Sequence, residues 1–412
     1  MKGRCFSILL VLLLPGFVCA AGCSGSTADS GSQRNVLPVT VSAAPVSGYV
    51  NGLFTSITVC VPGTTNCQTI DSVLVDTGSE GLRVLSSASG GQLSLALPQQ
   101  KDGNGDPIVD CNPFVDGYTW GPVQLADVKM GDEEARSVPI QVIGDPSFAS
   151  VPESCSGSGG PSENTLQTLG TYAILGVGPF AQDCGSICAE SPTALNTENP
   201  GNVYYVCPAS GCQSAAVAVD AQVQNPVALL PTDNNGVVID LSSVSSDGAP
   251  SVTGNLFFGI GTLPNNELGS ATVLPIDPDT LTFTTLYLGK AYDMSFIDSG
   301  SNAIYFLNSG TANMPDCPTP NDQFYCPDSI ANFTATNRGT NGATSSATFS
   351  VASTDTLLAS QSNVAFDDLA GPTGSSPPYY FDWGLPFFYG RKVFSALAGA
   401  TAPGGKTPYF AY

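Results

Sequence analysis

The sequence predicts an all-β protein built from two lobes, and three observations support this prediction. The 412 residues include 45 Gly and 32 Pro but only 11% charged residues, a composition typical of a turn-rich β protein. Short apolar runs recur between turn-forming residues. An apolar run that ends in Asp, a hydroxyl residue and Gly occurs once in each half of the chain. Because the chain exceeds the usual size of a single core, about 250 to 300 residues, we expect two lobes with one copy of this motif each.

The predicted strands are short runs rich in β-branched and aromatic residues, bounded by Gly, Pro, Asn and Asp. They are Leu53–Val61, Ser72–Val75, Val123–Val128, Val138–Ile143, Ala173–Val177, Gly236–Leu241, Val252–Ile260, Leu281–Leu288, Met294–Ile297 and Ala303–Leu307. One short helix is predicted at Asn363–Leu369. Three long loops, of a length that often carries binding function, are predicted at Gln99–Gly117, Gly144–Gly170 and Phe180–Asn202.

The charge and the absence of histidine exclude several classes of function. The formal net charge of −22 repels nucleic-acid phosphates and anionic lipid heads, so we expect no nucleic-acid partner. With no histidine, the chain has no imidazole base and no Ser-His-Asp system. Hydrolysis by this protein is therefore expected to depend on carboxylates, with no cofactor and no metal.

The N-terminal residues predict export. Residues 1–22 have the basic start, apolar run (Phe6–Val18) and small residues of a signal peptide. Ala20–Cys23 resembles a bacterial lipobox, which implies lipidation of Cys23; the alternative is ordinary signal-peptidase cleavage in the same segment. Residues 23–48, rich in Ser, Gly and Ala, are expected to form a flexible tether. We therefore expect a monomeric outer-membrane lipoprotein, or a periplasmic or cell-surface protein of a bacterium, with membrane contact only through the lipid.

The cysteines predict disulfides. Without Cys5, Cys19 and Cys23, an even number of the 13 cysteines remains, as is typical of an exported, disulfide-bonded chain. Close spacing suggests Cys60 with Cys67, Cys184 with Cys188, Cys207 with Cys212 and Cys317 with Cys326, which leaves Cys111 and Cys155. A zinc cluster built on the 184–188 and 207–212 pairs is the alternative, but an oxidising compartment and the lack of histidine favour disulfides.

The duplicated motif carries the chemistry. Residues 72–79 read SVLVDTGS and residues 295–301 read SFIDSGS, so Asp76 and Asp298 each follow an apolar run. Two carboxyl groups held about 3 Å apart cannot both ionise cheaply, so such a pair shares one proton at acid pH. The ionised member can deprotonate a water, and the protonated member can polarise a peptide carbonyl. The pair is therefore a candidate for peptide-bond hydrolysis.

These residues resemble the pepsin-like aspartic peptidases, a family of bilobal β proteins. The specific part of the resemblance is the pair of turns, Asp76–Ser79 and Asp298–Ser301, and the likeness extends over Tyr49–Phe394. Weaker matches lie at Tyr49–Phe54, Ile174–Gly178, Asn255–Gly259 and Gly384–Phe388. The chain is also similar to a family of uncharacterised bacterial lipoproteins, and this similarity implies no particular activity.

The resemblance implies a pepsin-like acid-protease fold, with an active-site cleft between pseudo-symmetric lobes at 49–264 and 265–412. It implies a polypeptide substrate or a protein ligand in that cleft. The roles it implies are catalysis by Asp76 and Asp298, hydrogen bonds across the lobe junction by Thr77 and Ser299, orientation of the carboxylates by Ser79 and Ser301, and backbone freedom from Gly78 and Gly300. The alternative is an inert pepsin-fold envelope lipoprotein that binds a protein or a glycan.

Two departures from known patterns are visible in the sequence. The tyrosine that covers the substrate in the family aligns ambiguously here: Tyr118 is the first candidate, and Phe114 and Trp120 are alternatives. Asp102–Asp106 resembles the start of a calcium loop, but Pro107 stands where such a loop has glycine. We therefore predict a solvated turn at Asp102–Asp106.

Overall fold

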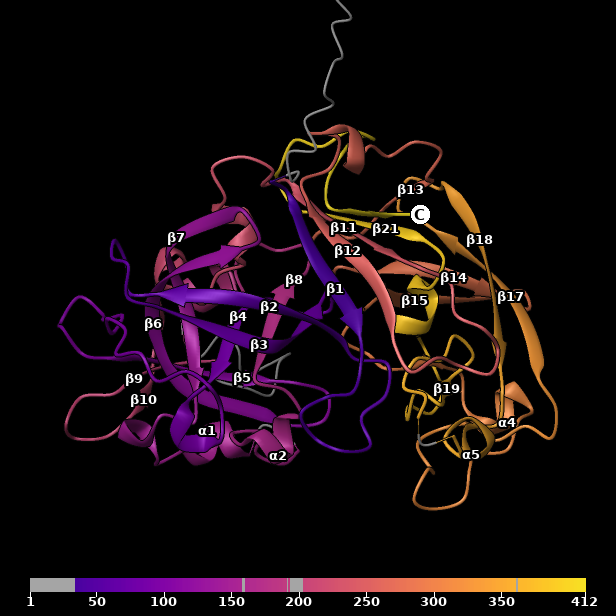
Figure 1. Ribbon diagram of the computed structural model, residues 1–412, viewed down its shortest axis with the longest axis horizontal. Helices are drawn as coiled ribbons and strands as arrows, with labels where there is room; N and C mark the ends of the chain where they lie inside the picture. Colours follow the sequence, from indigo (N-terminus) through magenta and orange to yellow (C-terminus); the bar gives the residue numbers. More distant parts are fainter. Residues whose placement is uncertain (1–33, 158–159, 191, 193–202, 361) are drawn as a thin grey trace, which may run out of the picture. The chain divides into compact units, whose positions relative to one another are not determined.

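The structure is a computed structural model of the chain, and it describes residues 34–157, 160–190, 192, 203–360 and 362–412. The predicted signal peptide, the lipidation site Cys23 and the first part of the predicted tether lie outside the described residues. The described residues form two lobes (Figure 1). Strands from the first half of the chain, drawn in indigo to magenta, gather on one side, and the orange strands of the second half gather on the other.

Most described elements are strands, and the helices are short. The strands are β1 (Val36–Val41), β2 (Leu53–Cys60), β3 (Cys67–Asp76), β4 (Glu80–Leu85), β5 (Ile108–Pro113), β6 (Tyr118–Met130), β7 (Glu133–Ile143), β8 (Ala173–Val177), β9 (Tyr204–Val206), β10 (Gln213–Ser214), β11 (Gly236–Leu241), β12 (Val252–Phe258), β13 (Val273–Pro275), β14 (Phe283–Tyr287), β15 (Lys290–Ile297), β16 (Ile304–Phe306), β17 (Ala331–Arg338), β18 (Thr344–Val351), β19 (Ala370–Gly371), β20 (Phe381–Trp383), β21 (Lys392–Ala396) and β22 (Tyr409–Ala411). The α-helices are α1 (Glu153–Ser156), α2 (Leu166–Leu169), α3 (Ser186–Glu190), α4 (Ser309–Ala312) and α5 (Thr354–Leu357). Short 3₁₀ helices are η1 (Ser87–Ser89), η2 (Pro146–Phe148), η4 (Val219–Ala221), η5 (Pro226–Leu229), η6 (Pro264–Asn266) and η7 (Leu385–Phe388).

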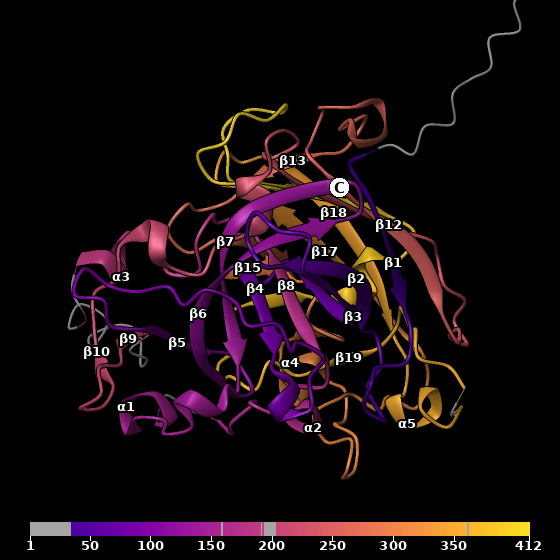
Figure 2. The same ribbon diagram turned by 60° about the vertical axis from the view of Figure 1, so that its left-hand side comes forward.

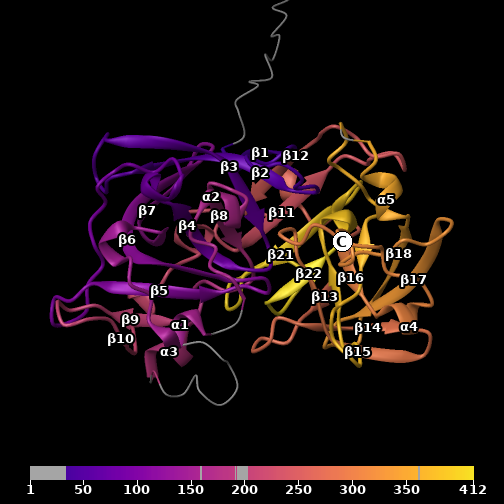
Figure 3. The same ribbon diagram turned by 90° about the horizontal axis from the view of Figure 1, so that it is seen from below.

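Two sheets organise the described part of the chain. The larger runs β10-β9-β5-β6-β7-β4-β8-β3-β2-β1-β12-β11-β21-β22-β13, and the smaller runs β18-β17-β14-β15-β20-β16-β19. The larger sheet therefore holds the strands of the first lobe and extends through β11, β21 and β22, which Figure 3 shows between the two lobes. The smaller sheet belongs to the second lobe.

Each lobe contains the same three-strand unit. In the first lobe, β8 pairs in parallel with β3 and antiparallel with β4, and Figure 2 shows these three strands side by side. In the second lobe, β20 pairs in parallel with β15 and antiparallel with β16. The repeated motif in the sequence therefore corresponds to a repeated unit in space. The predicted all-β, bilobal fold is confirmed.

Strand β1 corrects the predicted tether. Residues 36–41 lie inside the segment expected to be flexible, yet they form a strand between β2 and β12. The side chains of Leu37, Val39 and Val41 are buried in the main core, because their alternation matches the two-residue period of a strand. The tether prediction is thus wrong for this part of the chain.

Two other local predictions differ from the structure. The helix predicted at Asn363–Leu369 is absent from its described residues, where Ala365 instead forms a β-bridge with Ala249. The backbone N–H of Phe366 donates to the side chain of Asn51, which is distant in the sequence. The predicted loop at Gln99–Gly117 contains β5.

The predicted disulfides are confirmed. The described residues contain Cys60–Cys67, Cys111–Cys155, Cys184–Cys188, Cys207–Cys212 and Cys317–Cys326. Disulfides at this density indicate that the protein folds in an oxidising compartment. In the part of the chain that the structure describes, we find no helix of the length and apolarity needed to cross a bilayer.

Candidate active site

The two predicted aspartates face one pocket from opposite lobes. Asp76 is the last residue of β3, and Asp298 directly follows β15, where its backbone N–H donates to the carbonyl of Trp383 (3.1 Å). A pocket of about 510 Å³ is lined by both carboxyls and by residues of both lobes. The sequence repeat thus brings its two carboxylates together, as expected for a dyad.

The hydrogen bonds to the two carboxyls follow the same pattern. In the first turn, the Gly78 N–H donates to Asp76 Oδ1 (2.7 Å), and the Ser79 hydroxyl donates to Asp76 Oδ2. In the second turn, the Gly300 N–H donates to Asp298 Oδ1 (2.7 Å), and the Ser301 hydroxyl donates to Asp298 Oδ2 (2.8 Å). Each serine therefore orients its carboxyl, the placement that the sequence implied.

Thr77 and Ser299 connect the two turns. The Thr77 N–H donates to Ser299 Oγ (3.1 Å), and the Ser299 N–H donates to Thr77 Oγ1 (2.9 Å). Each hydroxyl also donates to a backbone carbonyl of the opposite strand, Ser299 to Val75 (2.8 Å) and Thr77 to Ile297 (3.3 Å). This buried, reciprocal set fixes the separation of the lobes at the dyad.

The turn glycines are required for a reason other than the expected one. Neither Gly78 nor Gly300 has a positive φ, so their backbone conformation does not demand glycine. A Cβ at Gly78 would lie 2.5 Å from Asp298 Cγ, and a Cβ at Gly300 would lie 2.5 Å from Asp76 Oδ1. Each carboxyl is therefore packed directly against the other turn, and only glycine leaves room for it.

Burial and charge make the pair hold a proton. Burial raises the pKa of Asp76 well above its ordinary range, and the nearby Asp298 charge and a hydrogen bond between the two carboxyls raise it further. Hydrogen bonds from Ser79 and Gly78 act in the opposite direction. Two carboxyls coupled in this way favour a state in which one is protonated and one is ionised, as acid–base chemistry requires.

A third carboxyl lies beside the dyad and was not predicted from the sequence. Asp382, on β20, lines the same pocket and is 6% exposed. Its Oδ2 lies 2.7 Å from the Ser301 hydroxyl oxygen. Burial raises the pKa of Asp382 well above its usual range, and the Asp298 charge adds to this effect. No motif flagged this residue, because it lies in a short apolar run far along the chain from either turn.

The hairpin formed by β5 and β6 covers one side of the pocket, and its tip corrects the predicted flap residue. Tyr118 is buried against the Cys111–Cys155 disulfide and Trp120, and it is not among the residues that line the pocket. Phe114 and Val115, at the hairpin tip, do line it. Of the three hairpin aromatics considered from the sequence, the one that lines the pocket is therefore Phe114, one of the two alternatives.

A second acidic pair lies at the same hairpin. Glu163 and Asp116 line the pocket, and burial together with Asp116 raises the pKa of Glu163 to about 8. Tyr49, assigned from the sequence only to the opening strand, also lines the pocket. The sequence placed Asp116 and Glu163 in two separate loops and gave no signal that they meet.

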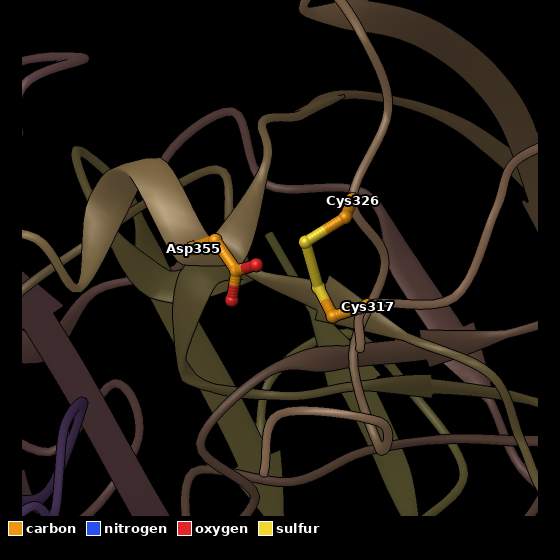
Figure 4. Close-up of side chains that lie close together, drawn as sticks. All are labelled: Cys317, Cys326 and Asp355. Atoms are coloured by element: carbon orange, nitrogen blue, oxygen red, sulfur yellow. A yellow bond between two sulfur atoms is a disulfide. The ribbon is translucent and has the colours of Figure 1, made fainter. Parts of the chain in front are cut away.

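The candidate metal-binding groups have other partners. Cys317, Cys326 and Asp355 lie close together, but Figure 4 shows the two sulfurs bonded to each other, so neither is a thiolate ligand. The cysteines of the alternative zinc cluster are likewise paired in disulfides. At the calcium-like turn, Asp102 Oδ1 accepts from the backbone N–H groups of Asn104 (2.9 Å) and Asp106 (2.8 Å). These bonds support a self-contained turn.

Comparisons with known proteins identify the family of the chain. A solved structure with a similar fold is the "Crystal structure of aspartic proteinase from Irpex lacteus", with 15% identity and a TM-score of 0.48, over 91% of this chain and 96% of that chain. No curated protein matches the sequence. The sequence model of the family described as "Protein of unknown function (DUF3443)" matches residues 31–412. Because that match covers almost the whole chain, the protein belongs to the DUF3443 family.

Proposed function

We propose that this protein is an aspartic endopeptidase of the bacterial cell envelope, with Asp76 and Asp298 as its catalytic dyad. The observation that carries the proposal is the packing of each carboxyl against the glycine of the other turn, inside a pocket lined by both lobes. Such contact makes the two carboxyls share a proton, which is the chemistry that a water-activating dyad requires.

The proposed reaction uses the two carboxyls in different protonation states. The ionised carboxylate takes a proton from a water held between the two groups, and that water attacks the peptide carbonyl. The protonated carboxyl donates a hydrogen bond to the carbonyl oxygen as negative charge develops there. The carboxyl that took the proton from the water then gives it to the leaving amine as the tetrahedral intermediate breaks down. Apart from the water and the peptide, these steps use only the two carboxyls.

The proposed occupant of the pocket is an extended polypeptide. Apolar side chains border the acidic floor, including Phe114 and Val115 at the hairpin and Phe296 and Tyr380 in the second lobe. Val115 is fully exposed at the hairpin tip, where a bound chain would cover it. Apolar contacts of this kind hold peptide side chains while the dyad acts on the backbone between them.

The test is cleavage of a denatured protein mixture by the purified full chain across about pH 3 to 7, the range in which a carboxylate pair shares its proton. We expect cleavage at acid pH and a loss of about 1,000-fold in kcat in Asp76→Asn and Asp298→Asn. The matched control is Asp279→Asn, an exposed carboxyl on a turn outside the pocket, which should keep full activity. Circular dichroism checks that each variant is folded.

A folded chain that cleaves nothing at any pH contradicts the proposal. The remaining function would then be the binding of a protein or glycan in the same pocket. Cleavage that survives both dyad substitutions would also overturn it, since the activity would come from elsewhere.

We also propose that the mature protein is anchored by a lipid on Cys23. A Cys23→Ala variant should move from the membrane fraction to the soluble periplasmic fraction. Mass spectrometry of the N-terminal peptide would detect the lipid directly. An unchanged distribution between the two fractions would contradict the anchor.

A further inference from the structure

Asp382 breaks the near-symmetry of the two lobes. In the first lobe, Asp76 lies level with Gly176, two residues after Ile174. In the second lobe, Ile297 pairs with Trp383, so Asp298 lies level with Gly384, two residues after Asp382. Ile174 and Asp382 thus occupy equivalent places beside the two carboxyls. The first lobe has an apolar side chain where the second has an acid.

Proton counting at Ser301 shows what this difference does. The Ser301 oxygen lies 2.8 Å from Asp298 Oδ2 and 2.7 Å from Asp382 Oδ2. Both distances are hydrogen bonds, but a serine hydroxyl has one hydrogen. The second bond must therefore be donated to Ser301, and the only hydrogen that can serve is one on a carboxyl. One of the two aspartates is thus protonated.

Burial decides which aspartate carries that proton. Asp382 is 6% exposed, and its Oδ1 has no hydrogen-bond partner among the described residues. Asp298 is more exposed and also accepts from the Gly300 N–H. A negative charge with an unpartnered buried oxygen costs more than one held by two donors. The proton therefore belongs on Asp382.

We propose that Asp382 is a positioning residue that remains protonated and assigns the roles in the dyad. Its carboxyl hydrogen is donated from Oδ2 to Ser301 Oγ, and the Ser301 hydrogen is donated to Asp298 Oδ2. The chain of two donors stabilises the ionised form of Asp298, which leaves the shared dyad proton on Asp76. Asp298 is then the base that activates water, and Asp76 is the acid that polarises the carbonyl. This inference rests on the proposed function only for its kinetic consequence.

The other ionisable groups around Asp382 do not oppose this assignment. Asp298 and Asp76 face it from the two turns, and both disfavour a charge on Asp382. Tyr305 of β16 and Tyr380 of the adjoining chain also face it; burial raises the pKa of each, and the Asp382 charge adds to the effect. No lysine or arginine is among the described residues that line the pocket. The two neighbouring carboxyls therefore favour the neutral form of Asp382, and no described cation lining the pocket opposes it.

The protonation of Asp382 can be tested without any activity. Infrared spectroscopy of the full chain in heavy water resolves the carbonyl band of protonated carboxyls from that of carboxylates. At neutral pD, we expect the protonated band to lose the intensity of one carboxyl in Asp382→Asn and in Asp382→Ile, the latter copying the first lobe. Asp279→Asn controls for changes in the exposed carboxylates. An unchanged protonated band in both Asp382 variants shows that Asp382 is ionised and overturns the proposal.

The effect on Asp298 is tested by comparing the two substitutions. Asparagine can still donate to Ser301, whereas isoleucine cannot. Each variant is also made in an Asp298→Asn background, and the difference between the two spectra isolates the carboxylate band of Asp298. We expect the midpoint of this band to lie about half a pH unit higher in Asp382→Ile than in Asp382→Asn. If Asp298 titrates at the same pH in the two variants, Asp382 does not act on Asp298 through Ser301. That result overturns the proposed role of Asp382 even if its carboxyl is protonated.

The kinetic consequence separates this inference from a structural role. In the pH profile of kcat, the midpoint on the acid side should lie about half a pH unit higher in Asp382→Ile than in the wild type, with KM unchanged. In Asp382→Asn this midpoint should equal that of the wild type. A structural role would lower kcat at every pH without moving the midpoint, and that result would overturn the inference. If no variant cleaves peptides, the proposed function fails, and the two infrared measurements still decide whether Asp382 acts on Asp298 through Ser301.

Discussion

Gly78 and Gly300 allow the two carboxyls to pack against the opposite turns. Each provides the space that the opposite aspartate fills, with 2.5 Å from an added Cβ to Asp298 Cγ at Gly78 and to Asp76 Oδ1 at Gly300. Side-chain atoms do not approach a Cβ this closely, so any substituent must displace a carboxyl. Activity should therefore be more sensitive than stability at these two positions.

The prediction at this scale is made for Gly300→Ala. The added methyl pushes Asp76 out of line, and we expect kcat to fall about 100-fold, as it does when reacting groups move by about 1 Å. The melting temperature should change by only a few degrees. Gly103→Ala is the control, because a Cβ there has no atom within 4 Å. Full activity in Gly300→Ala would show that the Asp76 carboxyl is not packed against Gly300.

At the residue scale, the sequence predicts the groups that belong to a repeated pattern and misses those that meet only through folding. The dyad, its glycines and its hydroxyls were predicted because two similar turns occur in one chain. Asp382 was missed because the same position in the first lobe is an isoleucine, so the repeat itself conceals it. Arg83 was also missed: it is completely buried and bonds to Asp183 (2.8 Å), which lies far away in the sequence.

At the level of elements, the β5–β6 hairpin separates packing from function by side-chain direction. Tyr118 and Trp120 are two residues apart on β6, so they lie on the same face and pack into the cluster around the Cys111–Cys155 disulfide. Phe114 lies beyond the end of β5, where no strand pairing constrains it, and lines the pocket. The aromatic residues of this hairpin thus have different tasks.

Paired substitutions in this hairpin give the second prediction. Phe114→Ala should lower kcat/KM about tenfold through the lost contact with substrate and leave the melting temperature unchanged. Tyr118→Ala should instead lower the free energy of unfolding by about 3 kcal/mol, because it empties a buried aromatic site. Steady-state kinetics and urea unfolding measure the two effects. A loss of kcat/KM in Tyr118→Ala together with a loss of stability in Phe114→Ala would show that Tyr118, and not Phe114, contacts the substrate.

The elements that the sequence predicted well are the ones with a complete local pattern. Ala173–Val177 and Gly236–Leu241 are strands with the predicted bounds, each an apolar run beside turn residues. β1 shows the opposite case, because its apolar alternation was present but followed a long Ser- and Gly-rich segment that dominated the interpretation. The segment after Asn363 fails as a helix since it is held by distant partners, including Asn51. Such long-range pairing leaves no local signal.

Over the whole molecule, buried carboxyls shift the conditions in which the fold is stable. Burial is the largest cause in each case: it raises the pKa of Glu80 to about 8 and that of Asp368 to about 6, and it raises the pKa of Asp110 well above its usual range. The unfolded chain releases these protons above about pH 4, whereas the folded chain retains them. The unfolded state then binds fewer protons, so the free energy of unfolding falls as pH rises.

The third prediction is therefore a protein that is most stable in acid. The contribution of these buried neutral acids to the free energy of unfolding is fully present below about pH 4. It is lost progressively as the pH rises to about 8, the pKa of Glu80. The matched variant is Glu80→Gln, which keeps an acceptor for the Phe180 N–H without the ionisation. It should flatten this slope by about 1.4 kcal/mol per pH unit at most, as measured by urea unfolding at several pH values. A stability that rises from pH 4 to 8 would contradict the burial of these groups as neutral acids.

The reciprocal bonds between Thr77 and Ser299 have an evolutionary consequence. In each turn, the backbone N–H depends on a hydroxyl supplied by the other turn, so neither site is complete within its own half. A substitution that removes one hydroxyl leaves a buried donor unpaired across the junction, at a cost of about 1 to 3 kcal/mol. Two copies of a duplicated segment bound in this way cannot diverge independently at these positions. Accepted changes at residue 77 in related chains should therefore come with a compensating change at residue 299, and neither half should persist as a separate gene.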